Sequence, residues 1–197
     1  MELDDVREKY KRKNQILFNR ESACLQPLLE AFRGQKRRTL VLWAFVSMQE
    51  PLEILRRRYT NEHCWDIAES VCWDWACGKV KMPVAKAAIL EVHRVAPLLD
   101  NSADCALCHA VAQACSSVHT EAHAIGLAFY ELTSVVRRYG IDDCEKEIGK
   151  TIGRYFENLE ESKKRIEKND IKWAAFLMKD SPINKEAQIY EKRRKKP

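Results

Sequence analysis

The run from Cys105 to Val136 constrains the fold most, because it contains only two carboxylates, Glu121 and Glu131, and no lysine or arginine. Two sets of its residues recur every three or four positions, which at about 3.6 residues per turn places each set along one side of a helix. The first set combines thiols, small residues and imidazoles: Cys105, Cys108, Ala112, Cys115, His119, His123, Gly126 and Tyr130. The second set is apolar: Leu107, Val111, Ala114, Val118, Ala122, Ile125, Phe129, Leu132 and Val136. A helix with so little polar surface must be covered on most sides, so the run predicts one long central helix over about residues 103–138.

Similar helical patterns flank this run and are separated by short polar stretches, which predicts an all-α fold. Six Gly and six Pro among 197 residues are few for a β sandwich or a disordered chain. We expect helices over about residues 3–32, 35–58, 61–77, 83–99, 143–168 and 173–178, with interruptions near Pro27 and Pro51. The sequence therefore predicts a single helical-bundle domain over residues 1–178 and a basic, loosely ordered tail over residues 179–197.

Charge and hydropathy indicate a cytoplasmic protein without a membrane span. Met1 to Asn14 mixes both charge signs and lacks the apolar core of a signal peptide. Each long apolar stretch is interrupted by polar residues before it reaches about 18 residues. The net charge is +5, and much of it comes from the segment between Lys185 and Pro197. Such a tail can contact phosphates, but a solvated terminus is the simpler interpretation, so nucleic acid is not the expected partner.

The eight cysteines predict free thiols, because in a reducing compartment cysteine behaves as a small buried hydrophobe. Cys105-Ala-Leu-Cys108-His109 matches the C-x-x-C-H pattern of covalent haem attachment. Covalent haem belongs to exported proteins, however, and this motif occurs once, at the start of the predicted central helix. A thioredoxin-like role lacks the strand–helix alternation that such a fold requires. We therefore expect no cofactor.

His119 and His123 lie four residues apart and would share one face of a continuous helix, as metal ligands do. Glu121 stands midway between them, so neither common zinc-protease pattern is matched. Polar side chains inside a bundle need hydrogen-bond partners. The sequence thus predicts a buried polar cluster or pocket and assigns no catalytic or metal-binding residues. The residues predicted to form that cluster are His119, His123, Tyr130, Arg94 and Trp75.

The order of several motifs resembles a family of all-helical immunity proteins, labelled five-like, that accompany bacterial polymorphic toxins. The motifs are Trp43-Ala44, Pro51-Leu52, Trp75, Gly78, Val92-His93-Arg94, Ala112-Gln113-Ala114, Val118-His119, His123-Ala124-Ile125-Gly126 and Tyr130. The resemblance covers about residues 35–140 and differs in its cysteines, which replace alanines of the family. It implies binding and neutralisation of a cognate toxin in the cytoplasm, without catalysis, and brings no set of functional residues with it.

Two hypotheses of different classes follow from these observations. The first is a toxin-binding protein. Inhibitors of nucleases tend to be acidic, so a basic chain favours a toxin with an acidic surface over a nuclease. The second is a helical small-molecule or metal-binding domain that uses His119 and His123, with further ligands from His63, His93, His109 or a thiol.

Overall fold

The computed structural model describes residues 1–179 and shows an all-α protein, with no β-strand in that part of the chain, as predicted. The α-helices are α1 (Asp4–Lys11), α2 (Gln26–Phe32), α3 (Arg37–Ser47), α4 (Gln49–Arg58), α5 (Cys64–Ala76), α6 (Met82–Val95), α7 (Ser102–Ser116), α8 (Ala124–Tyr139), α9 (Glu145–Lys168) and α10 (Ala175–Met178). The short 3-10 helices are η1 (Ala23–Leu25), η2 (Ala96–Leu98) and η3 (Glu121–His123). None of these helices combines the length and apolar character that crossing a bilayer requires. The predicted basic tail lies, from residue 180 on, outside the described residues.

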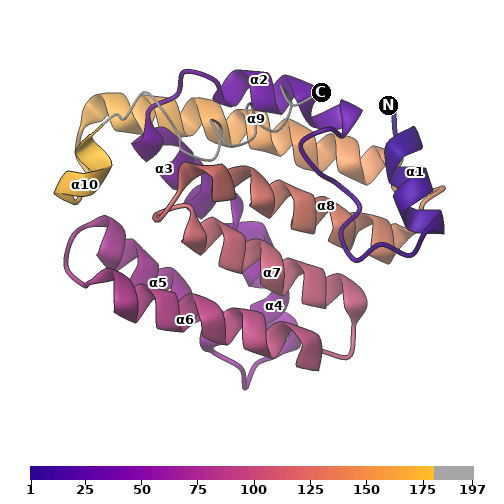
Figure 1. Ribbon diagram of the computed structural model, residues 1–197, viewed down its shortest axis with the longest axis horizontal. Coiled ribbons are helices and arrows are strands. Elements are labelled where there is room, and N and C mark those ends of the chain that lie inside the picture. The colour runs from indigo at the N-terminus through magenta and orange to yellow at the C-terminus, as the bar shows by residue number, and fades with distance from the viewer. Residues whose placement is uncertain (180–197) are drawn as a thin grey trace, which may run out of the picture.

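The prediction of one continuous central helix over residues 103–138 is wrong. The run forms two helices, α7 and α8, which are joined by a short turn and pack along each other as a hairpin. Figure 1 shows this hairpin between α9 with α2 on one side and the α5–α6 pair on the other. Both halves are covered on most sides, so the inference of a buried apolar run holds although the run folds back on itself.

The turn between α7 and α8 forms where the helix loses backbone hydrogen bonds. The hydroxyl groups of Ser116 and Ser117 donate to the carbonyls of Ala112 and Ala114 at 2.8 and 2.6 Å, which competes with regular helix geometry. From α3, the Arg37 guanidinium donates to the carbonyl oxygens of Val118 and His119 at 2.9 and 2.5 Å. A residue distant in sequence therefore satisfies the carbonyls that a continuous helix would have bonded internally.

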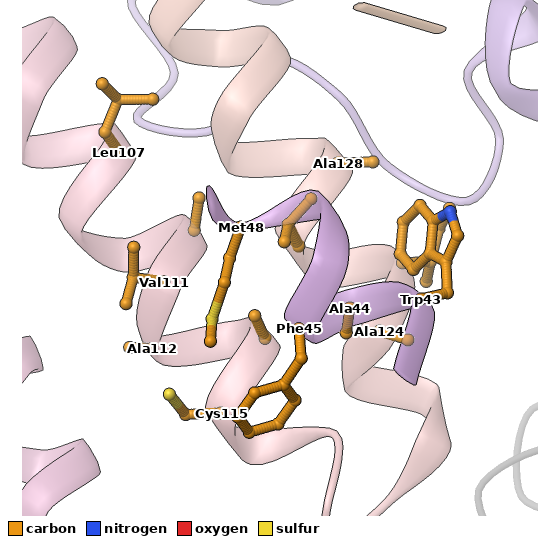
Figure 2. Packing of buried hydrophobic residues seen from close by; sticks show 14 of the residues in the cluster. Trp43, Ala44, Phe45, Met48, Leu107, Val111, Ala112, Cys115, Ala124 and Ala128 are labelled. Carbon is orange, nitrogen blue, oxygen red and sulfur yellow. The ribbon is translucent and has the colours of Figure 1, made fainter. Parts of the chain in front are cut away.

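The core is built around α7, which also packs against α4, α5 and α6. Small residues on α7 and α8, such as Ala112, Ala124 and Ala128, let the backbones approach closely. In Figure 2, Met48 at the junction of α3 and α4 points toward α7, and Phe45 lies beside Cys115. All of these side chains are buried. The close packing explains why this run carries so few charged residues.

Local signals place several helix boundaries as predicted. The Asn101 side chain caps α7 by accepting from the backbone N–H groups of Ala103 and Asp104. Pro27 lies in the first turn of α2, and Gly140 ends α8 at φ +83°. Pro51 lies in the first turn of α4, so the predicted helix over residues 35–58 is divided just before it.

Candidate functional site

The structure separates the five predicted site residues, so one buried cluster does not describe them. Arg94 is exposed near the end of α6 and forms an ion pair with Glu91, one turn earlier. Trp75 lies at the end of α5, where α6 begins. Twelve residues of α6 separate Met82 from Arg94, or roughly 18 Å at about 1.5 Å per residue. Arg94 is therefore at the other end of the α5–α6 pair from Trp75. The prediction used the spacing of residues along helices, which does not show how far apart residues of different helices lie.

His119 and Trp75 meet at the surface beside the turn between α7 and α8. Their rings stack with centroids 6.3 Å apart and an interplanar angle of 22°, and the imidazole is exposed. Because the helix breaks here, His119 and His123 do not share a helical face. The ring of Phe176, in α10, packs against the Trp75 ring, with the two centroids 5.7 Å apart. The resulting open pocket, with a volume of about 230 Å³, is lined by Arg37, Trp75, Met82, Val118, His119 and Phe176.

Arg37 supplies the positive charge of this pocket. Its guanidinium carbon lies 5.6 Å from the centre of the Phe176 ring, within cation–π range. Its Nε is 3.7 Å from a Glu121 carboxylate oxygen, beyond hydrogen-bond distance, and this buried N–H has no hydrogen-bond partner within residues 1–179. Burial lowers the pKa of Arg37, while the charge of Glu121 acts in the opposite direction. The arginine nevertheless stays protonated at neutral pH because its ordinary pKa is so high.

His123 belongs to a second group, which lies where α6, α7 and η3 meet. There the Nδ1 atoms of His93 and His109 lie 2.9 Å apart, so one must donate and the other accept. The His109 ring also contacts the Tyr130 ring of α8, with the two centroids 5.1 Å apart. We call His93, His109, His123 and Tyr130 the histidine cluster. Two of its members, His123 and Tyr130, are predicted site residues, whereas the sequence suggests His93 and His109 only as possible further ligands in a metal-binding domain.

Gln113 and Gly126 fix the position of His123 in this cluster. The Nδ1 atom of His123 is 2.8 Å from the Gln113 side-chain oxygen. A Cβ atom at Gly126 would lie only 2.6 Å from that same oxygen. Glycine thus leaves room for the Gln113 side chain between α7 and α8, which explains the small residue at this point of the first helical seam.

Burial favours the neutral form of two imidazoles in the histidine cluster, His93 and His109. It lowers the pKa of His93, with a further contribution from the charge of His123. It also lowers the pKa of His109 to about 4, and the charges of His93 and Arg137 act in the same direction. Burial also raises the pKa of Tyr130, which belongs to the cluster, and that of the nearby Cys105 thiol. The groups that shift these imidazole pKa values therefore supply no negative charge to stabilise a protonated imidazole.

We expect acid to destabilise the fold through His109. Its pKa is near 6.5 in the unfolded chain and about 4 in the folded one. The unfolded state therefore binds more protons between these values, and stability is full above about pH 7 and falls toward pH 4. Because the imidazole is only half-buried, solvent screening reduces the effect to about 1–2 kcal/mol.

Urea unfolding at several pH values measures this loss of stability. His109→Gln should flatten the profile, whereas His63→Gln, at an exposed site, should not; equal profiles for wild type and His109→Gln would contradict the assignment.

No group of three or more His, Cys, Asp or Glu side chains within residues 1–179 is arranged to hold a metal ion. All eight cysteines are free. The Cys64 and Cys72 thiols of α5 lie next to Cys108 and Cys115 of α7, and these contacts, together with burial, raise the pKa of the two α7 thiols. Such thiols are weak nucleophiles because little thiolate is present.

A second, larger pocket of about 560 Å³ lies between α3, α5 and α9. Its lining residues are Leu42, Phe45, Val46, Gln49, Glu69, Ser70, Trp73, Glu161 and Arg165. Its charged side chains have partners within the molecule: Glu69 pairs with Arg56, and Arg165 lies 3.9 Å from Glu161. Two residues of the predicted cluster or pocket, Trp75 and His119, line the smaller pocket, whereas the larger pocket was not predicted, because its lining comes from segments that are distant in sequence.

A family model described as Imm-5 like putative immunity protein matches residues 30–158 of the chain. The match runs from the end of α2 into α9, and is wider than the region of resemblance expected from the motifs. It contains the histidine cluster and every wall of the smaller pocket except Phe176. Searches among curated proteins and among solved structures give no match.

Proposed function

Because the chain belongs to the Imm-5 like family, we propose that it binds a cognate bacterial toxin in the cytoplasm and neutralises it without catalysis. The family match carries this proposal. The chemistry of the molecule supports it, since His93 and His109 contact each other, His123 contacts Gln113, and the buried thiols of Cys108 and Cys115 have raised pKa values. The net charge of +5 favours a toxin with an acidic surface.

Co-expression with the toxin encoded beside its gene tests this function. Cells that produce the toxin with this chain should form colonies as cells without toxin do, and the two proteins should purify together as a complex. An immunity protein from an unrelated toxin system, expressed at the same level, is the control and should not rescue growth. If the cells die and no complex is recovered, the chain is not the antidote of that toxin.

A further inference from the structure

The pocket beside Trp75 has the size and lining of a site for one side chain of a protein partner. Its volume of about 230 Å³ is below the usual range of roughly 300–1,000 Å³ for small-molecule sites. Aromatic rings form two of its walls, Trp75 from α5 and Phe176 from α10. Interfaces typically concentrate binding energy where one large side chain enters such a pocket. In Figure 1 the α5–α6 connection, the turn between α7 and α8, and α10 lie at the same end of the molecule.

Exposed apolar side chains extend this pocket into a surface patch. Met82, which lines the pocket, is 42% exposed. On the other side of the pocket, Met178 follows Phe176 in α10 and is 48% exposed. Methionine is enriched at protein interfaces and adapts to the shape of a partner. The patch therefore offers apolar contact area around the aromatic pocket.

The lysines near this patch favour an acidic partner. Lys36 precedes Arg37, Lys81 precedes Met82, and Lys86 lies one helical turn after Met82 on the same side of α6. All three are exposed, and none forms an ion pair with the residues that the structure describes. Glu121 is the acidic side chain at the pocket, and it lies next to Arg37. The rim is thus net positive, in contrast to the larger pocket, whose charged side chains have partners within the molecule.

From this combination we propose that the toxin docks on a surface made of the pocket, this apolar patch and the three lysines, which we call the docking patch. Its residues are Lys36, Arg37, Trp75, Lys81, Met82, Lys86, His119, Phe176 and Met178. The partner segment is acidic and inserts an apolar or aromatic side chain into the pocket that Trp75 and Phe176 line. The inference rests on the proposed toxin-binding function and deepens it by naming the surface and the chemistry of the bound segment.

A double variant, Lys81→Glu with Met82→Glu, tests the surface. Both positions are exposed, so the fold should be retained, which circular dichroism checks. Its affinity for the purified toxin encoded beside the gene, measured by calorimetry, should fall at least 100-fold, because an acidic segment would meet two new carboxylates. The matched control is Leu98→Glu with Lys146→Glu, which makes the same charge change at exposed positions in η2 and at the start of α9. The control should bind within threefold of wild type.

A second variant, His119→Ala, removes the exposed ring that stacks on Trp75 and should weaken binding about tenfold. If wild type binds and both pocket variants bind equally well, the toxin docks elsewhere and this assignment is overturned, while the proposed function stands. If wild type itself does not bind, the proposed function fails and the docking surface fails with it.

Discussion

Asp104→Ala should lower the free energy of unfolding by about 3 kcal/mol, because it removes the centre of a buried ionic network. The Asp104 side chain is only 2% exposed. Both of its oxygens accept from Arg58 at 2.8 Å, and it also accepts from Arg138 and from the Tyr59 hydroxyl, each at 3.1 Å. These contacts join the end of α4 and the end of α8 to the start of α7. The pKa of Tyr59 rises to about 12, through burial and then through its hydrogen bond to Asp104.

The loss should not reach the upper limit for a broken buried pair, about 5 kcal/mol, because both arginines retain access to water. The side chains of Arg58 and Arg138 are 44% and 26% exposed. Urea unfolding measures the effect as a lower midpoint at unchanged slope. Asp142→Ala is the matched control: Asp142 pairs with Arg7 at 2.6 Å but is 81% exposed, so its loss should stay within about 0.5 kcal/mol. If the two variants are equally stable, the buried network does not hold these helices together.

Helices whose signals are local could be predicted from the sequence. The amphipathic pattern over residues 143–168 corresponds to α9, Glu145–Lys168, and the expected short helix over residues 173–178 contains α10. In these segments the cap, the apolar face and the terminating residue are neighbours in sequence. The local sequence signals therefore suffice to predict these two helices without knowledge of the tertiary structure.

The break between α7 and α8 could not be predicted because its cause is tertiary. Neither glycine nor proline interrupts residues 116–123, and the apolar spacing continues through them. What replaces the lost helical bonds is Arg37, which is 81 residues away from Val118. Two helices that each bury most of their surface give the same periodic pattern as one longer helix, so spacing alone does not distinguish the two arrangements.

The same break determines where the predicted site residues His119 and His123 lie. A continuous helix would have placed His119 and His123 together, whereas the turn sends His119 to the surface beside Trp75 and leaves His123 near His93. The residue types correctly indicated that His119 and His123 need partners, since both histidines take part in polar or aromatic contacts. Their partners come from α5, α6 and α7, and no sequence spacing records which helices are neighbours in the fold.

Trp43→Ala should cost about 3–5 kcal/mol, which is a large part of the 5–15 kcal/mol that stabilises a typical domain. Trp43 is completely buried in α3. Its ring packs edge-on against the rings of Phe32 in α2 and Tyr155 in α9, with centroid distances of 4.7 and 5.4 Å. Its indole N–H donates to the Tyr155 carbonyl at 2.8 Å. The side chain therefore joins three helices, and its removal leaves a cavity that these helices cannot close without moving.

Trp43→Phe separates the packing from the hydrogen bond. Phenylalanine keeps a ring in the same place but cannot donate, and it fills less volume, so a loss of about 1–2 kcal/mol is expected. Thermal and urea unfolding of both variants measure the difference. A loss below about 1 kcal/mol for Trp43→Ala would mean that α2 and α9 unfold separately from the α7–α8 hairpin. Losses of the expected size, in a single transition, would mean that this layer and the α7–α8 hairpin beside the proposed docking patch fold as one unit.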